Sequence, residues 1–204
     1  MQDMQNTKIY EVGINEAKRI SNADAKMTQP GSLKHFLWGS EKSEQSMVIR
    51  FGRVFEKMIQ EQVKSSPRFF LGTNGVQKIN GQKKKKDVDL LFIDDVTKTV
   101  YYRELKANID LDTEKLPATT DKIKLIEGHL RETYPSYSIN SGILCMSVYS
   151  EAMLDMRLVK KVETYSKAGV PVDFASDIFD TLGVNISVDE YEAFGREAGD
   201  ILRS

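Results

Sequence analysis

Apolar side chains recur at helical spacing in several parts of the chain. The clearest pattern covers residues 43–63, where apolar residues return every three or four positions, as in an amphipathic helix. The members of this apolar face are Met47, Phe51, Val54, Phe55, Met58 and Ile59. The same criterion predicts further helices near residues 14–26, 118–132, 151–167, 173–182 and 188–202.

Strands are predicted where apolar residues alternate with polar ones or form short continuous runs. The segments are 68–71, 86–93, 99–106 and 143–149, and the last is apolar enough for a strand buried on both faces. The order is helix, strands, helix, strand and helices. It predicts an α/β fold, with a small mixed central sheet flanked by helices. We find no internal repeat or linker, so residues 1–204 are expected to form a single domain.

The segments 86–93 and 99–106 predict a β-hairpin with a turn at residues 95–98. If the hairpin is symmetric about residues 96 and 97, Asp89 lies opposite Glu104. Opposed side chains project to one face, about 4.5–5.5 Å apart, and each face recurs every second residue. One face is therefore expected to carry Asp87, Asp89, Glu104 and Lys106, and the other Val88, Leu90, Phe92 and Leu105.

This polar face indicates a metal site. Asp89 and Glu104 would repel each other unless a cation lay between them, and Mg²⁺ is commonly held by one or two carboxylates together with water and phosphate oxygens. Such an ion activates water for attack on a phosphodiester, and Lys106 would stabilise the developing charge. A one-residue bulge would bring Asp87 into the site instead. The pattern also fits a solvent-exposed hairpin with cross-strand ion pairs.

Composition and charge narrow the function classes. The chain has 204 residues and a net charge of −1, but residues 172–204 hold eight acidic and two basic residues, whereas the rest holds 22 acidic and 27 basic. A polyanion would meet the basic part, although an acidic face without a partner is equally compatible. Cys145 is the single cysteine, so no disulfide forms within the chain, and no apolar run is long enough to span a membrane. We expect a cytoplasmic protein.

Four consecutive lysines, Lys83, Lys84, Lys85 and Lys86, lead into the first strand of the hairpin. They are candidates for contacts with DNA phosphates, and Asn108 is another. A lysine-rich loop that protects a sheet edge is the alternative. Further candidates for DNA contacts are Arg50, Arg53, Lys57, Thr119, Thr120 and Lys122.

Asp89, followed fifteen positions later by Glu104-x-Lys106, resembles the motif of the PD-(D/E)xK nuclease superfamily. Over about residues 85–130 the chain is similar to type II restriction endonucleases, notably in Tyr-Tyr-Arg-Glu-Leu-Lys-Ala-Asn (101–108) and Leu-Asp-Thr-Glu-Lys-Leu-Pro-Ala-Thr (111–119). Val88 stands where the motif nominally has proline. The resemblance implies a restriction-endonuclease-like core at about 43–150, with C-terminal helices at 151–204. It also implies an acid on the preceding helix, for which Glu56 is best placed.

The resemblance further implies the activity. Asp89, Glu104, Lys106 and Glu56 would be catalytic, with Asp89 and Glu104 binding Mg²⁺. The protein would hydrolyse double-stranded DNA at a specific sequence, as a homodimer, and a cognate DNA methyltransferase would protect the host. Two alternatives stay open: a repair, recombination or structure-specific nuclease of the same fold, and a non-catalytic DNA-binding protein.

Overall fold

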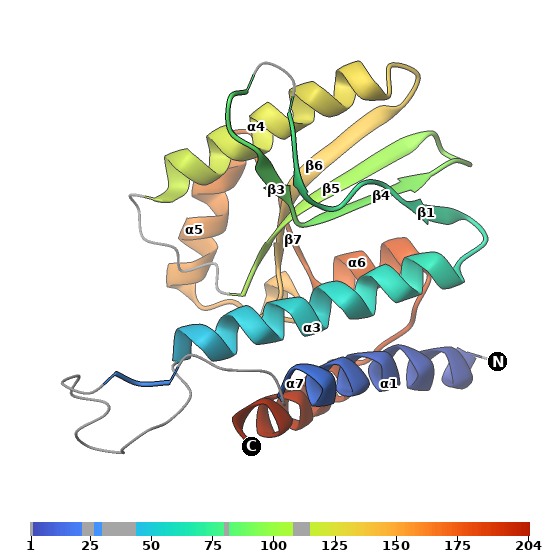
Figure 1. Ribbon diagram of the computed structural model, residues 1–204, viewed down its shortest axis with the longest axis vertical. Coiled ribbons are helices and arrows are strands. Elements are labelled where there is room, and N and C mark those ends of the chain that lie inside the picture. The colour runs from blue at the N-terminus through green and yellow to red at the C-terminus, as the bar shows by residue number, and fades with distance from the viewer. Residues whose placement is uncertain (1, 22–26, 30–43, 80–81, 108–114) are drawn as a thin grey trace. The chain divides into compact units, whose positions relative to one another are not determined.

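The protein is an α/β fold in a computed structural model that describes residues 2–21, 27–29, 44–79, 82–107 and 115–204 (Figure 1). The chain divides into two compact units. The first contains Met1–Met58 and Ile186–Ser204, and the second contains Ile59–Asn185. Helix α3 (Glu44–Ser65) begins in the first unit and ends in the second, and it confirms the helix predicted at 43–63.

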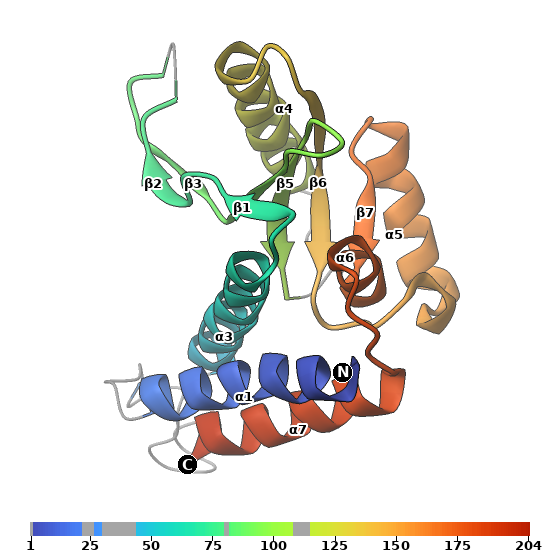
Figure 2. The ribbon, with the colours of Figure 1, turned by 90° about the vertical axis from the view of Figure 1, so that its right-hand side faces the viewer.

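In the first unit, α1 (Gln2–Ser21) and α7 (Val188–Arg203) lie side by side (Figures 1 and 2). They approach closely at Gly13, where an added Cβ would lie 2.5 Å from the ring of Phe194. Helix α7 begins at a capping box, in which Ser187 and Glu190 each accept a hydrogen bond from the other's backbone amide. The helix predicted near 14–26 is part of α1, which begins at residue 2 and has Ile9, Ala17 and Ile20 on one buried face. Residues 22–26 of that prediction lie outside the described residues.

The second unit is built on a mixed five-stranded sheet in the order β1-β4-β5-β6-β7. Its strands are β1 (Phe69–Leu71), β4 (Leu90–Asp94), β5 (Thr99–Lys106), β6 (Ser138–Cys145) and β7 (Val172–Phe174). Strands β1, β4 and β5 pair antiparallel, whereas β5, β6 and β7 pair parallel. A separate two-stranded sheet, β2 (Gly75–Gln77) with β3 (Lys86–Val88), projects from this sheet (Figure 2).

Helices α4 (Lys115–Thr133) and α5 (Met156–Lys167) pack against one face of the main sheet. The apolar cluster beneath them includes Leu91, Ile93, Val100, Tyr102, Ile123, Ile126, Leu130, Ile143, Val162 and Tyr165. The remaining elements of this unit are the short 3-10 helix η1 (Glu151–Met153) and α6 (Ala175–Leu182). The predicted helix at 118–132 is confirmed as the clear part of α4.

The hairpin of β4 and β5 has the predicted register. Leu90 pairs with Arg103 and Asp94 pairs with Thr99, so the hairpin is symmetric about residues 96 and 97, as predicted. The turn lies at residues 95–98 and is fixed by Asp94, whose Oδ1 accepts hydrogen bonds from the amides of Val96 and Thr97 at 3.0 and 3.2 Å.

The first predicted strand, however, is interrupted at Asp89. Strand β3 ends at Val88 and pairs with β2, so Asp87 lies opposite Val76 rather than Lys106. Val88 packs in the same cluster as Leu91 and Ile93, not on the face predicted for it. The reason is that β3 pairs with β2, so the alternation of side chains between the two faces of the sheet does not continue across Asp89.

Two other strand boundaries also differ from the predictions. The strand expected at 143–149 is β6, which runs from Ser138 to Cys145, because its first residues pair with β5 despite their polar character. Residues 141–146 are buried, as the apolar run indicates. The helix expected at 173–182 begins only at Ala175, because Val172–Phe174 form the edge strand β7.

Candidate functional site

Asp89 occupies the junction between β3 and β4. Its Oδ2 accepts a hydrogen bond from the backbone amide of Leu105 at 2.9 Å. This bond extends the register of the hairpin by one position and places Asp89 beside Glu104 on the face covered by α4. The Asp89 side chain is 19% exposed, so this carboxylate is half-buried.

Glu104 lies on β5, and its side chain is only 6% exposed. Lys106 Nζ lies 2.8 Å from Oε1, whereas the hydroxyl of Tyr102 donates to Oε2 at 3.0 Å. Both neighbours come from the same strand two residues away, which is the spacing of one strand face. The face predicted to hold Glu104 and Lys106 is therefore the face of the sheet that α4 covers.

Lys122, on α4, contacts both carboxylates. Its Nζ lies 2.5 Å from Glu104 Oε2 and 3.6 Å from Asp89 Oδ1. The sequence alone identified Lys122 only as one of several candidates for DNA contact. The structure places its ammonium between the two acids instead, where it offsets their mutual repulsion.

Burial and neighbouring charges shift the pKa values of Asp89, Glu104 and Lys122. Burial, together with the charge of Glu104, raises the pKa of Asp89 to about 7. Burial would also raise the pKa of Glu104, but Lys106 and Lys122 outweigh it and hold that pKa below its usual value. Burial would lower the pKa of Lys122, but Asp89 and Glu104 raise it above its usual value. Positive charge next to Asp89 and Glu104 therefore stabilises the charged forms of these two carboxylates.

The donor set suits a hard divalent cation. Oδ1 of Asp89 and Oε2 of Glu104 both contact one cation, the Lys122 ammonium. Within the described ranges, no group of three or more His, Cys, Asp and Glu side chains lies close enough to hold a metal. Water and substrate oxygens would complete the coordination, as is usual for Mg²⁺.

The structure describes most, but not all, of the other predicted site residues. Asp87 is exposed, and its charge contributes to the raised pKa of Asp89. Glu56 is half-buried on α3 and belongs to the first unit, so it enters none of the distances given above. Asn108 lies outside the described residues. Thr119 and Thr120 are buried on α4, which is incompatible with direct contact to DNA in this conformation.

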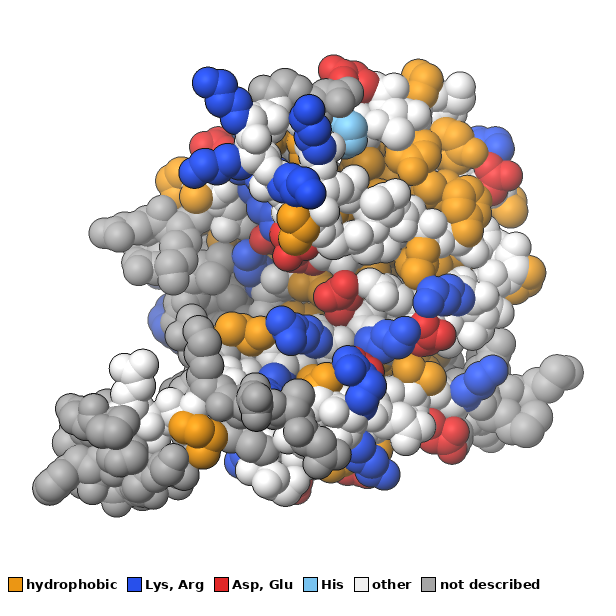
Figure 3. Space-filling model, viewed as in Figure 1, with side chains coloured by type: hydrophobic (Ala, Val, Ile, Leu, Met, Phe, Trp, Pro, Cys, Tyr) orange, Lys and Arg blue, Asp and Glu red, His pale blue; other side chains and the backbone are white. Residues whose placement is uncertain are grey.

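The lysine run lies at the small sheet. Lys83, Lys84 and Lys85 are exposed and Lys86 begins β3, two residues before the strand ends next to Asp89. Lys78, after β2, is exposed as well. Basic side chains gather over this part of the surface (Figure 3).

Arg103 is a buried charged residue that the sequence patterns did not single out. Its guanidinium donates to Asp173 Oδ2 at 2.7 Å and to the backbone and side-chain oxygens of Asn140 at 2.7 and 2.8 Å. These bonds join β5 to β6 and β7. Arg103 therefore stabilises the parallel half of the sheet, whereas its neighbour Glu104 points to the candidate site.

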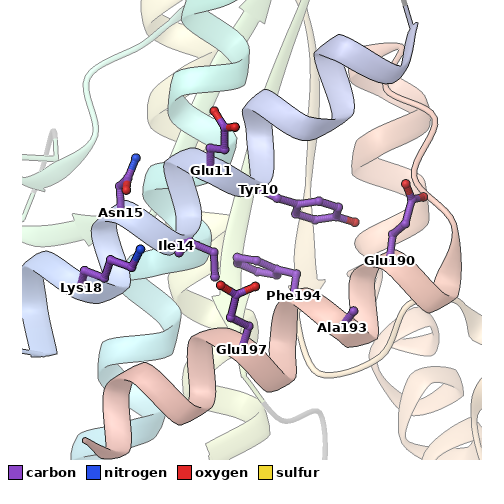
Figure 4. Close-up of a pocket in the computed structure, with 9 residues that line it drawn as sticks. All are labelled: Tyr10, Glu11, Ile14, Asn15, Lys18, Glu190, Ala193, Phe194 and Glu197. Carbon is purple, nitrogen blue, oxygen red and sulfur yellow. The ribbon is translucent and has the colours of Figure 1, made fainter.

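Two cavities are lined by residues other than those of the candidate site. One, of about 430 Å³, lies between α1 and α7, where the stacked rings of Tyr10 and Phe194 point toward one another (Figure 4). The other, of about 480 Å³, is lined by polar residues at the start of β6 and by Glu127. Neither is lined by Asp89, Glu104, Lys106 or Lys122, so the chemistry of the side chains, not cavity size, identifies the candidate site.

The chain was compared with known proteins by sequence and by structure. No protein-family model and no curated protein matches it. Among solved structures, it is similar to the crystal structure of protein VC1899 from Vibrio cholerae, with 11% sequence identity and a TM-score of 0.43. The similarity covers 96% of this chain and 57% of that one. Within the described residues, no helix is long and apolar enough to cross a membrane.

Proposed function

We propose that the protein is a Mg²⁺-dependent nuclease, and specifically a type II restriction endonuclease that cuts double-stranded DNA at a defined sequence. One observation carries the proposal. Asp89 and Glu104, from separate segments, share a single cation beside a second lysine, Lys106, in a half-buried cluster. The motif resemblance over residues 85–130 supports the same activity.

The chain's own residues have distinct parts in the proposed reaction. Asp89 and Glu104 would hold Mg²⁺, and the Leu105 amide and Tyr102 hydroxyl fix the orientation of these two carboxylates. When bound, the ion supplies an activated water and offsets charge on the phosphate. Lys106, held by Glu104, would stabilise the charge that develops on the phosphorus-bound oxygens.

The lysine run supports DNA as the substrate. Lys83, Lys84 and Lys85 offer exposed charge for phosphates a few residues before Asp89 along the chain. Recognition of a two-fold symmetric site would require a homodimer, and host DNA would be protected by a cognate methyltransferase. The homodimer and the methyltransferase are both parts of the proposal that the protein is a restriction endonuclease.

The test uses the full chain with unmethylated phage DNA and Mg²⁺. The variants are Asp89→Asn, Glu104→Gln and Lys106→Met, and Asp95→Asn is a matched control, because Asp95 is an exposed acid in the turn of the same hairpin. We expect discrete fragments from the wild type and the control only. Circular dichroism shows whether each variant is folded.

The other outcomes separate the alternatives. A smear, or cutting confined to junctions or flaps, would indicate a repair or recombination nuclease of the same fold. DNA binding by the wild type with no cleavage of any substrate would contradict both enzymatic functions and leave a DNA-binding protein.

A further inference from the structure

We propose that Lys122 is a built-in counter-ion of the Asp89–Glu104 pair, which a divalent cation must displace in order to bind. Lys122 would thus hold the empty site together and lower its affinity for metal. This inference rests on the proposed metal site, and it adds a competitor from within the chain.

The four carboxylate oxygens are unequally engaged. Asp89 Oδ2 is held by the Leu105 amide, and Glu104 Oε1 is held by Lys106. Lys122 contacts the other two oxygens, Asp89 Oδ1 and Glu104 Oε2. Glu104 Oε2 also accepts a hydrogen bond from the Tyr102 hydroxyl. A metal ion that binds both acids through these oxygens would occupy the position of the ammonium.

Two cations cannot share that position. Unit charges a few ångströms apart in a partly buried site repel by several kcal/mol. Lys122 is 21% exposed, so water screens this repulsion only in part. The flexible side chain of a lysine can move its ammonium away from the carboxylates at little steric cost. Metal binding would therefore drive Lys122 away from the acids.

Lys106 differs from Lys122 in this respect. It contacts the opposite oxygen of Glu104 and no oxygen of Asp89 among the ion pairs of the described residues. Its ammonium can stay in place when a metal binds between the acids. The inference therefore distinguishes two lysines of similar exposure, each 21% exposed.

A purely structural ion pair would behave differently. Replacing Lys122 with glutamine would leave the buried Glu104 and the half-buried Asp89 without their shared cation, and the protein would lose stability in either case. Only if Lys122 occupies the metal position would an added cation recover that loss. Metal-induced stabilisation is therefore the informative measurement.

The experiment titrates Mn²⁺ into the full chain without DNA, by calorimetry and by thermal unfolding. The variants are Lys122→Gln and Lys122→Arg, and Lys124→Gln is the control, because Lys124 is exposed two positions along the same helix. Weaker Mn²⁺ binding by Glu104→Gln would show that the ion binds at this site. We expect Lys122→Gln to bind Mn²⁺ about tenfold more tightly than the wild type, because the competing charge is gone. Its melting temperature should rise further with Mn²⁺ than that of the wild type.

Lys122→Arg keeps the charge and should bind Mn²⁺ no more tightly than the wild type, as should Lys124→Gln. Wild-type or weaker affinity in Lys122→Gln would overturn the counter-ion role while leaving the metal site intact. If Lys122→Gln does not fold, Mn²⁺ binding by Lys122→Arg that is tighter than that of the wild type would overturn the counter-ion role. Absence of Mn²⁺ binding to every variant and to the wild type would overturn the metal site as well.

Discussion

Asp89 accepts a hydrogen bond from the backbone amide of Leu105 through its side chain, at the point where β3 has turned away toward β2. The carboxylate takes the place that a strand carbonyl would have in a continuous hairpin. Asp89 is therefore tied to β5 through the same group that is proposed to bind metal. Its charge state affects the stability of the fold and the chemistry of the site together.

The first prediction concerns pH. The pKa of Asp89 is raised from 3.8 to about 7 by burial and by Glu104, so between these values the folded protein keeps a proton that the unfolded chain has lost. The contribution of Asp89 to stability is thus fully present below about pH 4 and is lost as pH rises through 7. The full loss is on the order of 4 kcal/mol.

Asp89→Asn should remove this dependence. In metal-free urea unfolding at pH 5, 6, 7 and 8, the free energy of unfolding of the wild type should fall relative to that of the variant as the pH rises. Asp95→Asn, at an exposed acid, is the control. Parallel curves for the wild type and Asp89→Asn would contradict the raised pKa.

The second prediction concerns Tyr102. Its hydroxyl is buried and donates to Glu104 Oε2, so Tyr102→Phe removes a donor to a charged acceptor. The cost should be about 1.5–3 kcal/mol in the free energy of unfolding. Tyr101→Phe is a matched control on the next position of β5, where the side chain is half-buried. Equal losses in the two variants would show that the Tyr102 hydrogen bond has no specific role.

The third prediction concerns the parallel half of the sheet. Arg103→Lys keeps a charge at a buried position but cannot reproduce the contacts of the guanidinium with both Asp173 and Asn140. We expect a loss of about 1–3 kcal/mol from the missing hydrogen bonds, measured by urea unfolding. Arg131→Lys, in an exposed pair with Glu127 on α4, should cost less than about 1 kcal/mol. A small loss at Arg103 would mean that the buried network is replaceable.

The fourth prediction concerns DNA affinity. Lys83→Gln combined with Lys84→Gln should weaken binding and reduce the salt dependence of the association constant. The slope of log K against log salt should decrease by about 0.9 for each phosphate that the protein no longer neutralises. Lys160→Gln with Lys167→Gln removes two exposed charges from α5 and is the control. If both pairs reduce the slope equally, the effect comes from net charge and not from the lysine run.

The sequence predicts the hairpin register because two local signals agree there, the turn residues at 95–98 and the alternation in residues 99–106. It does not predict the break at Asp89, because the partner of β3 is β2, which the pattern does not identify as a strand. The alternative of a solvent-exposed hairpin face does not fit Glu104, because Glu104 is buried and contacts Lys122 of α4.

Lys122 and Arg103 were missed as site and core residues for a related reason. Lys122 precedes Ile123, which lies on the buried face of α4. The helical periodicity alone therefore does not show whether the Lys122 side chain points to the sheet or to solvent. Its position over Glu104 depends on how α4 packs on the sheet. Arg103 meets Asp173, seventy residues further along the chain, and no local pattern indicates such a pair.

The position of β5 gives the two carboxylates unequal mechanical support. Strand β5 pairs with β6 along its whole length, from Thr99 to Lys106, so the backbone at Glu104 should exchange its amide hydrogens only in the most extensive openings. Asp89 instead follows a three-residue strand of the small sheet. Displacement of the β2–β3 sheet, for example by a ligand held at its lysines, would move Asp89 while Glu104 stayed in place. Of the two carboxylates, Asp89 is therefore the one whose position depends on both the β2–β3 sheet and the main sheet.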